Sequence, residues 1–253
     1  EFEADLYAVW ESDGQIGVVL KDYGCYEENG GYTYSEICTV PVSGGTFELP
    51  KSYKSGYVFT GWLGSDGQTY TAGTQIKISA STEFTAQYAT GTFEIDGKTY
   101  STDRPHGSQS LGWAYDPHTE WNWGQAEIDI YSNYSGKPIS VSGNIALHLD
   151  GMITGAAGQP AISADGNVRI YANRYGHSAA DKLSAQVYGG AGAPAVKATG
   201  NIWIDGLNSY TQTLVFKGDN GRPAFEAQRV CFFEPLLAGE SETAADFVGI
   251  YQA

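Results

Sequence analysis

The sequence is poor in charged residues, in cysteine and in long apolar runs. Charged residues make up 17% of the 253 positions, with 14 basic and 29 acidic residues. The resulting net charge of −15 argues against nucleic acid or an anionic membrane surface as a partner. No apolar run is long enough to cross a bilayer, so we expect no membrane insertion in this segment.

The cysteines and histidines lack the spacing of a metal site. An odd set of three cysteines without a CxxC step argues against a disulfide framework or a zinc site. Cys25 and Cys38 either bridge within one hairpin or remain free thiols, and a turn at residues 29–31 would place Cys25 opposite Ser35 instead. The four histidines are His106, His118, His148 and His177. None shows ligand spacing, so we expect no metal and no cofactor.

What the sequence does contain favours β-structure. It has 33 glycines, 18 tyrosines and 13% aromatic residues, with Ser and Thr throughout and a single Met. Aromatic and β-branched residues suit strands, and glycine suits the turns between them. We therefore predict an all-β protein.

The first third of the chain carries a recognisable motif. Residues 56–62 read GYVFTGW, a turn follows at Asp66-Gly67, and residues 82–88 alternate like a closing strand. This segment resembles the internalin-type B repeat, also called the Listeria–Bacteroides repeat. The resemblance implies a β-grasp-like module over residues 11–90, repeated in tandem on bacterial surface proteins as a spacer or adhesive element. Residues 1–10 are then the last strand of a preceding repeat, and Trp62 and Phe59 are core residues.

Four segments of the remaining chain share one pattern, in which Gly-x-Pro precedes an alternation of apolar and polar residues. They begin at Gly136, Gly158, Gly192 and Gly221. Their alignment predicts an inward ladder of Ile139, Ile162, Val196 and Phe225 and an outward ladder of Ser140, Ser163, Lys197 and Glu226. A corner follows at Asn144, Asn167 and Asn201, and then a second alternating strand. Asparagine tolerates the left-handed conformation at such a corner, and it can bond the equivalent asparagine of the next coil.

Such units bury their apolar face only by stacking, which predicts a right-handed parallel β-helix over residues 91–253. A β-sandwich of short strands is the alternative. Gly91–Tyr100 reads as a hairpin that turns at Asp96-Gly97, and Ala126, Ile128 and Ile130 share one face of a first, incomplete coil. This part resembles the short β-helical domains of Gram-positive surface proteins that are labelled carbohydrate-binding.

A catalytic site is not indicated. Lyases and hydrolases of β-helical fold need clustered aspartates, but the sequence has no Asp-Asp pair and no Asn-x-Asp step. Asp129, Asp150, Asp165 and Asp205 fall at different phases of the repeats, so we expect them not to share one groove. We predict that the chain is not an enzyme.

The stretch GWAYDPHTEWNWG, residues 112–124, concentrates four rings. If residues 116–120 form a loop, Tyr115 lies opposite Trp121 and Trp113 opposite Trp123, and all four share one face of a hairpin. That face either caps the first coil or offers a platform for sugar rings, and capping is the stronger hypothesis. Trp203, between inward-facing neighbours, is the best candidate for an exposed ring. The candidate ligand-binding residues are therefore Trp203, Trp121, Trp123, Trp113 and Tyr115.

Together these observations predict a non-catalytic extracellular segment of a bacterial cell-surface protein. It would act in adhesion or carbohydrate binding, as a monomer, with glycans or host surface molecules as partners. The first alternative is a purely structural spacer, and the second is a polysaccharide lyase or glycoside hydrolase. Because the chain starts at Glu1 without Met or a signal peptide, we expect it to be part of a longer polypeptide.

Overall fold

The computed structural model describes residues 16–26, 32–42, 45–54, 56–117, 126–171, 183–205 and 211–233. These residues form strands, turns and one short 3-10 helix, η1 (Gln109–Leu111), so the predicted all-β class is confirmed. Within the same ranges, no helix has the length and apolar character needed to span a membrane. Residues 1–10, predicted as the end of a preceding repeat, lie outside the described part.

The chain divides into two compact units. One, the N-terminal unit, holds residues 1–24, 34–52 and 60–87, and the other, the C-terminal unit, holds residues 25–33, 53–59 and 88–253. The short segment 53–59 therefore packs with the second half of the chain.

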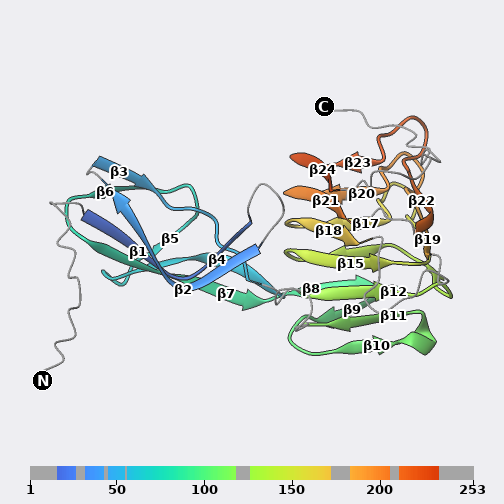
Figure 1. The fold of residues 1–253 in the computed structure, drawn as a ribbon, viewed down its shortest axis with the longest axis horizontal. Helices are drawn as coiled ribbons and strands as arrows, with labels where there is room; N and C mark the ends of the chain where they lie inside the picture. Colours follow the sequence, from blue (N-terminus) through green and yellow to red (C-terminus); the bar gives the residue numbers. More distant parts are fainter. Residues whose placement is uncertain are drawn as a thin grey trace, which may run out of the picture. The chain divides into compact units, whose positions relative to one another are not determined.

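The N-terminal unit is built around a mixed sheet. Its strand order is β2 (Tyr32–Val42), β1 (Ile16–Tyr26), β7 (Thr82–Thr90), β4 (Tyr57–Gly64) and β5 (Thr69–Tyr70), and a separate pair joins β3 (Gly45–Glu48) to β6 (Gln75–Ile78). β1 and β7 run parallel, and β4 and β5 run antiparallel. Figure 1 shows these long strands in blue and blue-green.

The GYVFTGW motif contributes to both units, with Phe59 in the C-terminal unit and Trp62 in the core of the N-terminal unit. Trp62 on β4 is fully buried, and its indole N–H donates to the carbonyl of Pro50 at 2.7 Å. Its predicted core role is therefore confirmed. Phe59 is only half-buried and meets Tyr88 edge-to-face, with ring centroids 5.9 Å apart. No disulfide joins Cys25 to Cys38, so the alternative of a bond between them is not realised.

The C-terminal unit stacks its strands into three sheets. The first sheet runs β10 (His106–Ser108), β11 (Trp113–Asp116), β12 (Glu127–Ile130), β15 (Ile145–Leu149), β18 (Val168–Tyr171), β21 (Asn201–Asp205) and β24 (Arg229–Phe233). The second runs β9 (Lys98–Ser101), β8 (Thr92–Ile95), β14 (Ile139–Val141), β17 (Ile162–Ala164), β20 (Val196–Ala198) and β23 (Phe225–Glu226). The third runs β13 (Ser135–Gly136), β16 (Met152–Thr154), β19 (Leu183–Tyr188) and β22 (Thr211–Lys217).

Successive repeats add one strand to each sheet, always in parallel. β15, β18, β21 and β24 follow one another in this way, and Figure 1 shows them one above another. The second sheet pairs Ile139 with Ile162, Ile162 with Val196, and Val196 with Phe225, which is the inward ladder predicted from the sequence. All four side chains are buried. The repeats therefore align in space as they align in sequence.

The asparagine corners join consecutive coils by hydrogen bonds. The Asn144 Oδ1 atom accepts from the Asn167 backbone N–H at 2.7 Å, and Asn167 Oδ1 accepts from the Asn201 N–H at 2.8 Å. Bonding between equivalent asparagines is thus confirmed. None of the three has a positive φ, so the corners do not use the left-handed conformation that asparagine tolerates. The glycines before the second and third corners, Gly166 and Gly200, are needed for space. A Cβ on Gly166 would lie 2.5 Å from Asn144 Oδ1.

Antiparallel strands close the first end of the stack. The predicted hairpin at Asp96-Gly97 is confirmed as β8–β9, with φ of 55° and 72° at these two residues, and β8 pairs with β14. β10 and β11 extend the other sheet beyond β12 in the same antiparallel way. As predicted, Ala126, Ile128 and Ile130 are buried on one face.

Candidate functional site

Two of the predicted ring residues are core residues. Trp113 and Tyr115 on β11 are 2% and 1% exposed and point into the end of the stack. The Phe93 ring lies 4.5 Å from Tyr115 and 6.0 Å from Trp113, measured between centroids. The Tyr115 hydroxyl donates to the Thr102 carbonyl at 2.9 Å, and burial raises the pKa of this phenol. The capping interpretation is therefore confirmed for these two rings.

The predicted pairing of the rings is wrong. Tyr115 lies opposite His106 on one side and Ile128 on the other, so neither edge of β11 is open to Trp121. The same holds for Trp113, whose neighbours are Ser108 and Ile130. Trp121 and Trp123 themselves lie outside the described residues.

Trp203 does not present an exposed ring. It points outward from β21, because Ile202 and Ile204 on either side are buried inward, yet it is only 1% exposed. Its neighbours in register are Arg169 on β18 and Cys231 on β24. The expectation that this ring is available to solvent is therefore wrong, and alternation along the strand explains the error. Alternation gives the face of the sheet on which a residue lies, and says nothing about what covers that face.

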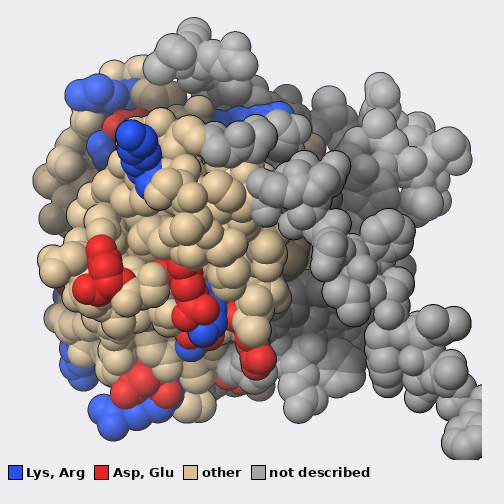
Figure 2. Space-filling model, turned by 90° about the vertical axis from the view of Figure 1, so that its left-hand side faces the viewer, with Lys and Arg blue, Asp and Glu red and all other residues tan. Residues whose placement is uncertain are grey.

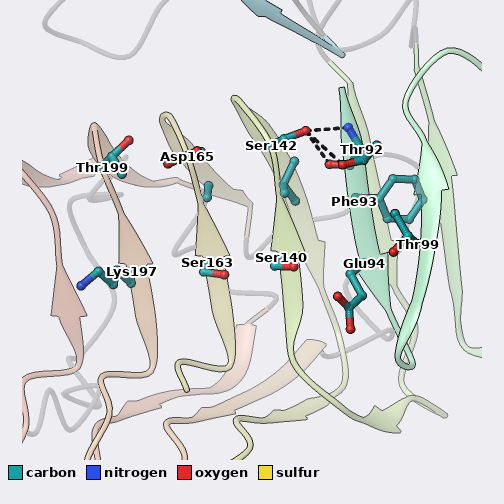
Figure 3. Close-up of a pocket in the computed structure, with 12 residues that line it drawn as sticks. Thr92, Phe93, Glu94, Thr99, Ser140, Ser142, Ser163, Asp165, Lys197 and Thr199 are labelled. Carbon is teal, nitrogen blue, oxygen red and sulfur yellow. Dashed lines mark hydrogen bonds between the residues drawn. The ribbon is translucent and has the colours of Figure 1, made fainter. Parts of the chain in front are cut away.

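An open groove lies on the outer face of the sheet that contains β14, β17 and β20. We call this outer face the groove face. It encloses about 410 Å³ and extends across β8, β14, β17 and β20. Two rows of polar side chains line it, as Figure 3 shows: Thr92, Ser142, Asp165 and Thr199 in one row, and Glu94, Ser140, Ser163 and Lys197 in the other. The second row follows the register, with Glu94 opposite Ser140, Ser140 opposite Ser163, and Ser163 opposite Lys197. The predicted outward ladder is therefore confirmed.

Contacts within the groove hold part of its lining in place. The Ser142 hydroxyl donates to the Thr92 carbonyl at 2.9 Å and accepts from the Thr92 N–H at 2.5 Å. Lys197 forms an ion pair with Glu226 on the neighbouring strand, with both side chains about half exposed. Ser140 and Ser163 are half-buried and carry their hydroxyls into the groove (Figure 3).

The groove suits hydrogen bonding to a hydrated ligand. Its lining offers hydroxyl donors and acceptors, two carboxylates and one ammonium group, while its buried residues, Phe93, Val141 and Ala164, lie at the base. On the face that Figure 2 shows, acidic and basic side chains lie scattered among uncharged ones.

A second polar cluster lies on the outer face of β12, β15, β18 and β21, which we call the histidine face. Glu127, Asp129 and His148 bring one ligand atom each within 4.8 Å of one another. No ligand spacing in the sequence indicates this group, because His148 belongs to the next coil. The sequence signal that could have revealed the group is the Glu-x-Asp step. Residues two apart on a strand lie on the same face, so Glu127 and Asp129 share the outward face of β12, beside the outward residues of β15.

The aspartates also differ from expectation. Asp129 and Asp205 stand in the same row of the backbone register, with His148 and Tyr171 between them. The prediction that they fall at different phases is therefore wrong. Two strands separate them, so they do not form a carboxylate pair of the kind that glycosidases use.

No protein-family model, no curated protein and no solved structure gives a significant match to this chain.

Proposed function

We propose that this chain is a non-catalytic binding segment of a bacterial cell-surface protein that holds carbohydrate along the groove face. The observation that carries the proposal is the double row of hydroxyl and charged side chains, which crosses successive strands in register. A groove that runs along the stack suits an extended chain. Its hydroxyls and carboxylates match the donors and acceptors of sugars. Extracellular placement, a glycan or host-surface partner and a monomeric state belong to the same proposal.

The proposed architecture is a right-handed parallel β-helix that follows a β-grasp-like repeat. Parallel pairing of each repeat with the next supports a helix over a β-sandwich, because sandwiches are made of antiparallel sheets. Connections between parallel strands of one sheet are right-handed in nearly all proteins, which gives the proposed hand. GYVFTGW on β4 supports kinship with the internalin-type B repeat over residues 11–90, with the coils over residues 91–253.

A binding assay with matched variants tests the function. We expect the purified chain to give a reproducible signal on a glycan array. The double variant Ser140→Leu/Ser163→Leu should lose this signal, because the two larger leucine side chains fill the groove. Thr154→Leu is the control, since Thr154 is an exposed residue on the third sheet. A signal that survives the double variant places binding elsewhere and contradicts the proposal. Release of reducing or unsaturated sugar from a bound glycan would instead indicate an enzyme.

A structural spacer is the second candidate. The burial of Trp113, Tyr115 and Trp203 favours it, because none of these described rings is left to stack on a sugar. The corner hydrogen bonds and the continuous apolar core would also make a stiff column. A broad array without any signal would favour this function.

A further inference from the structure

Three potential metal ligands meet on the histidine face. Glu127 and Asp129 are two residues apart on β12, so both point to the same side of the strand. Asp129 lies opposite His148 of β15 in register. The result is one imidazole and two carboxylates whose ligand atoms all lie within 4.8 Å of one another. This is close enough for the three groups to reach one ion after small side-chain adjustments.

The surroundings hold the imidazole in a defined position. The His148 ring stacks on Tyr171 of the next strand, with centroids 4.7 Å apart and planes inclined by 19°. Its Nε2 atom lies 2.9 Å from Glu127 Oε1, so this nitrogen faces the carboxylates. The residue opposite Glu127 is Ala146, which is fully buried. Ring position and ligand direction are thus set before any ion arrives.

Burial makes the negative charge of the cluster costly. The side chains of His148 and Glu127 are only 6% and 12% exposed. Two carboxylates held this close in a dry environment repel each other and favour a bound cation. Arg169 is the next base on this face, and its guanidinium carbon lies 5.1 Å over the Tyr171 ring.

We propose that Glu127, Asp129 and His148 bind a divalent transition-metal ion, with Zn²⁺ as the best match. A set of one nitrogen and two oxygen ligands suits Zn²⁺, whereas Ca²⁺ and Mg²⁺ prefer ligand sets made of oxygen. Three protein ligands leave a fourth position for water. The ion would tie β12, the first strand of the parallel ladder, to β15 of the next coil. This site is separate from the groove and does not depend on carbohydrate binding.

Calorimetric titration of the chelator-treated full chain with ZnCl₂ tests the site. We expect one ion per chain, and at least tenfold weaker binding in Asp129→Asn and in His148→Gln. Glu94→Gln is the matched control, because Glu94 is an exposed carboxylate on the groove face and should leave the titration unchanged. CaCl₂ and MgCl₂ should bind at least tenfold more weakly than ZnCl₂. Circular dichroism of each variant shows whether it is folded.

Several results would overturn the proposal. They are the absence of saturable Zn²⁺ binding by the folded wild-type chain, binding that persists in both ligand variants, and a preference for Ca²⁺ or Mg²⁺. If His148→Gln fails to fold, Asp129→Asn and the wild-type titration decide the matter. The visible absorption of a Co²⁺-loaded chain adds a direct readout. Bands of a four-coordinate ion that disappear in Asp129→Asn support the site, and bands unchanged in that variant contradict it.

Discussion

The two outer faces of the stack come from the same coils but differ in their contact with water. On the groove face, Lys197 and Glu226 keep about half of their side-chain surface exposed. On the histidine face, Trp203 is 1% and His148 5% exposed. Both faces alternate inward and outward residues with the same period of two. The difference shows that alternation assigns a side chain to a face of a sheet, while the surroundings of that face decide its exposure.

The groove face and the histidine face also differ in the kind of ligand that their polar groups suit. The exposed face carries hydroxyls and charges in a wide groove, which suits a large hydrated ligand that exchanges with solvent. The buried face holds an imidazole and two carboxylates in a small space, where charge is poorly screened and an ion would be held strongly. If both proposals hold, one stack serves two kinds of recognition with the same backbone.

The largest expected effect comes from a substitution on the buried face. Trp203→Ala should lower the free energy of unfolding by about 3–5 kcal/mol, because it removes a large buried ring and leaves a cavity. Lys197→Ala is the control from the same coil and should stay within about 0.5 kcal/mol. Urea denaturation followed by circular dichroism measures both. Equal losses in the two variants would remove the distinction between the faces.

A smaller effect is expected at the corner between the faces. Asn167→Ala should cost about 1–3 kcal/mol, because Asn167 is 4% exposed and its loss leaves the Asn201 N–H without its acceptor. Thr199→Ala, an exposed position next to the following corner, should change stability little. The same urea titration checks this prediction. An unchanged midpoint in Asn167→Ala would mean that the corner bonds do not couple the coils.

The smallest effect belongs to the ion pair on the groove face. A double-mutant cycle on Lys197→Ala and Glu226→Ala should give a coupling of about 0.2–1 kcal/mol, since both side chains are half exposed. Added salt should reduce this coupling because it screens exposed charges. Urea denaturation of the four proteins at low and high salt measures it. A coupling above this range and insensitive to salt would show that this face is as dry as the other.

Much of the repeat architecture was predictable from local pattern. The inward and outward ladders of the second sheet, the Asp96-Gly97 hairpin and the Asn–Asn bonds all appeared as expected. They were predictable because a strand alternates with a fixed period and similar repeats stack in similar register. The pairing of Tyr115 was not predictable, because both edges of β11 are occupied by strands that lie outside the aromatic stretch. The meeting of Glu127, Asp129 and His148 was not predictable either, because His148 comes from the coil after the one that holds Glu127 and Asp129.

The sequence by itself determined the all-β class, the four-fold repetition and the side of the sheet on which each repeat residue lies. Those properties depend on alternation and on turn residues, which are local. Only the tertiary structure decided that Trp203 is buried, that Trp113 and Tyr115 close the end of the core, and that Glu127, Asp129 and His148 meet. These depend on contacts between coils and on the cover over each outer face, which no local pattern specifies.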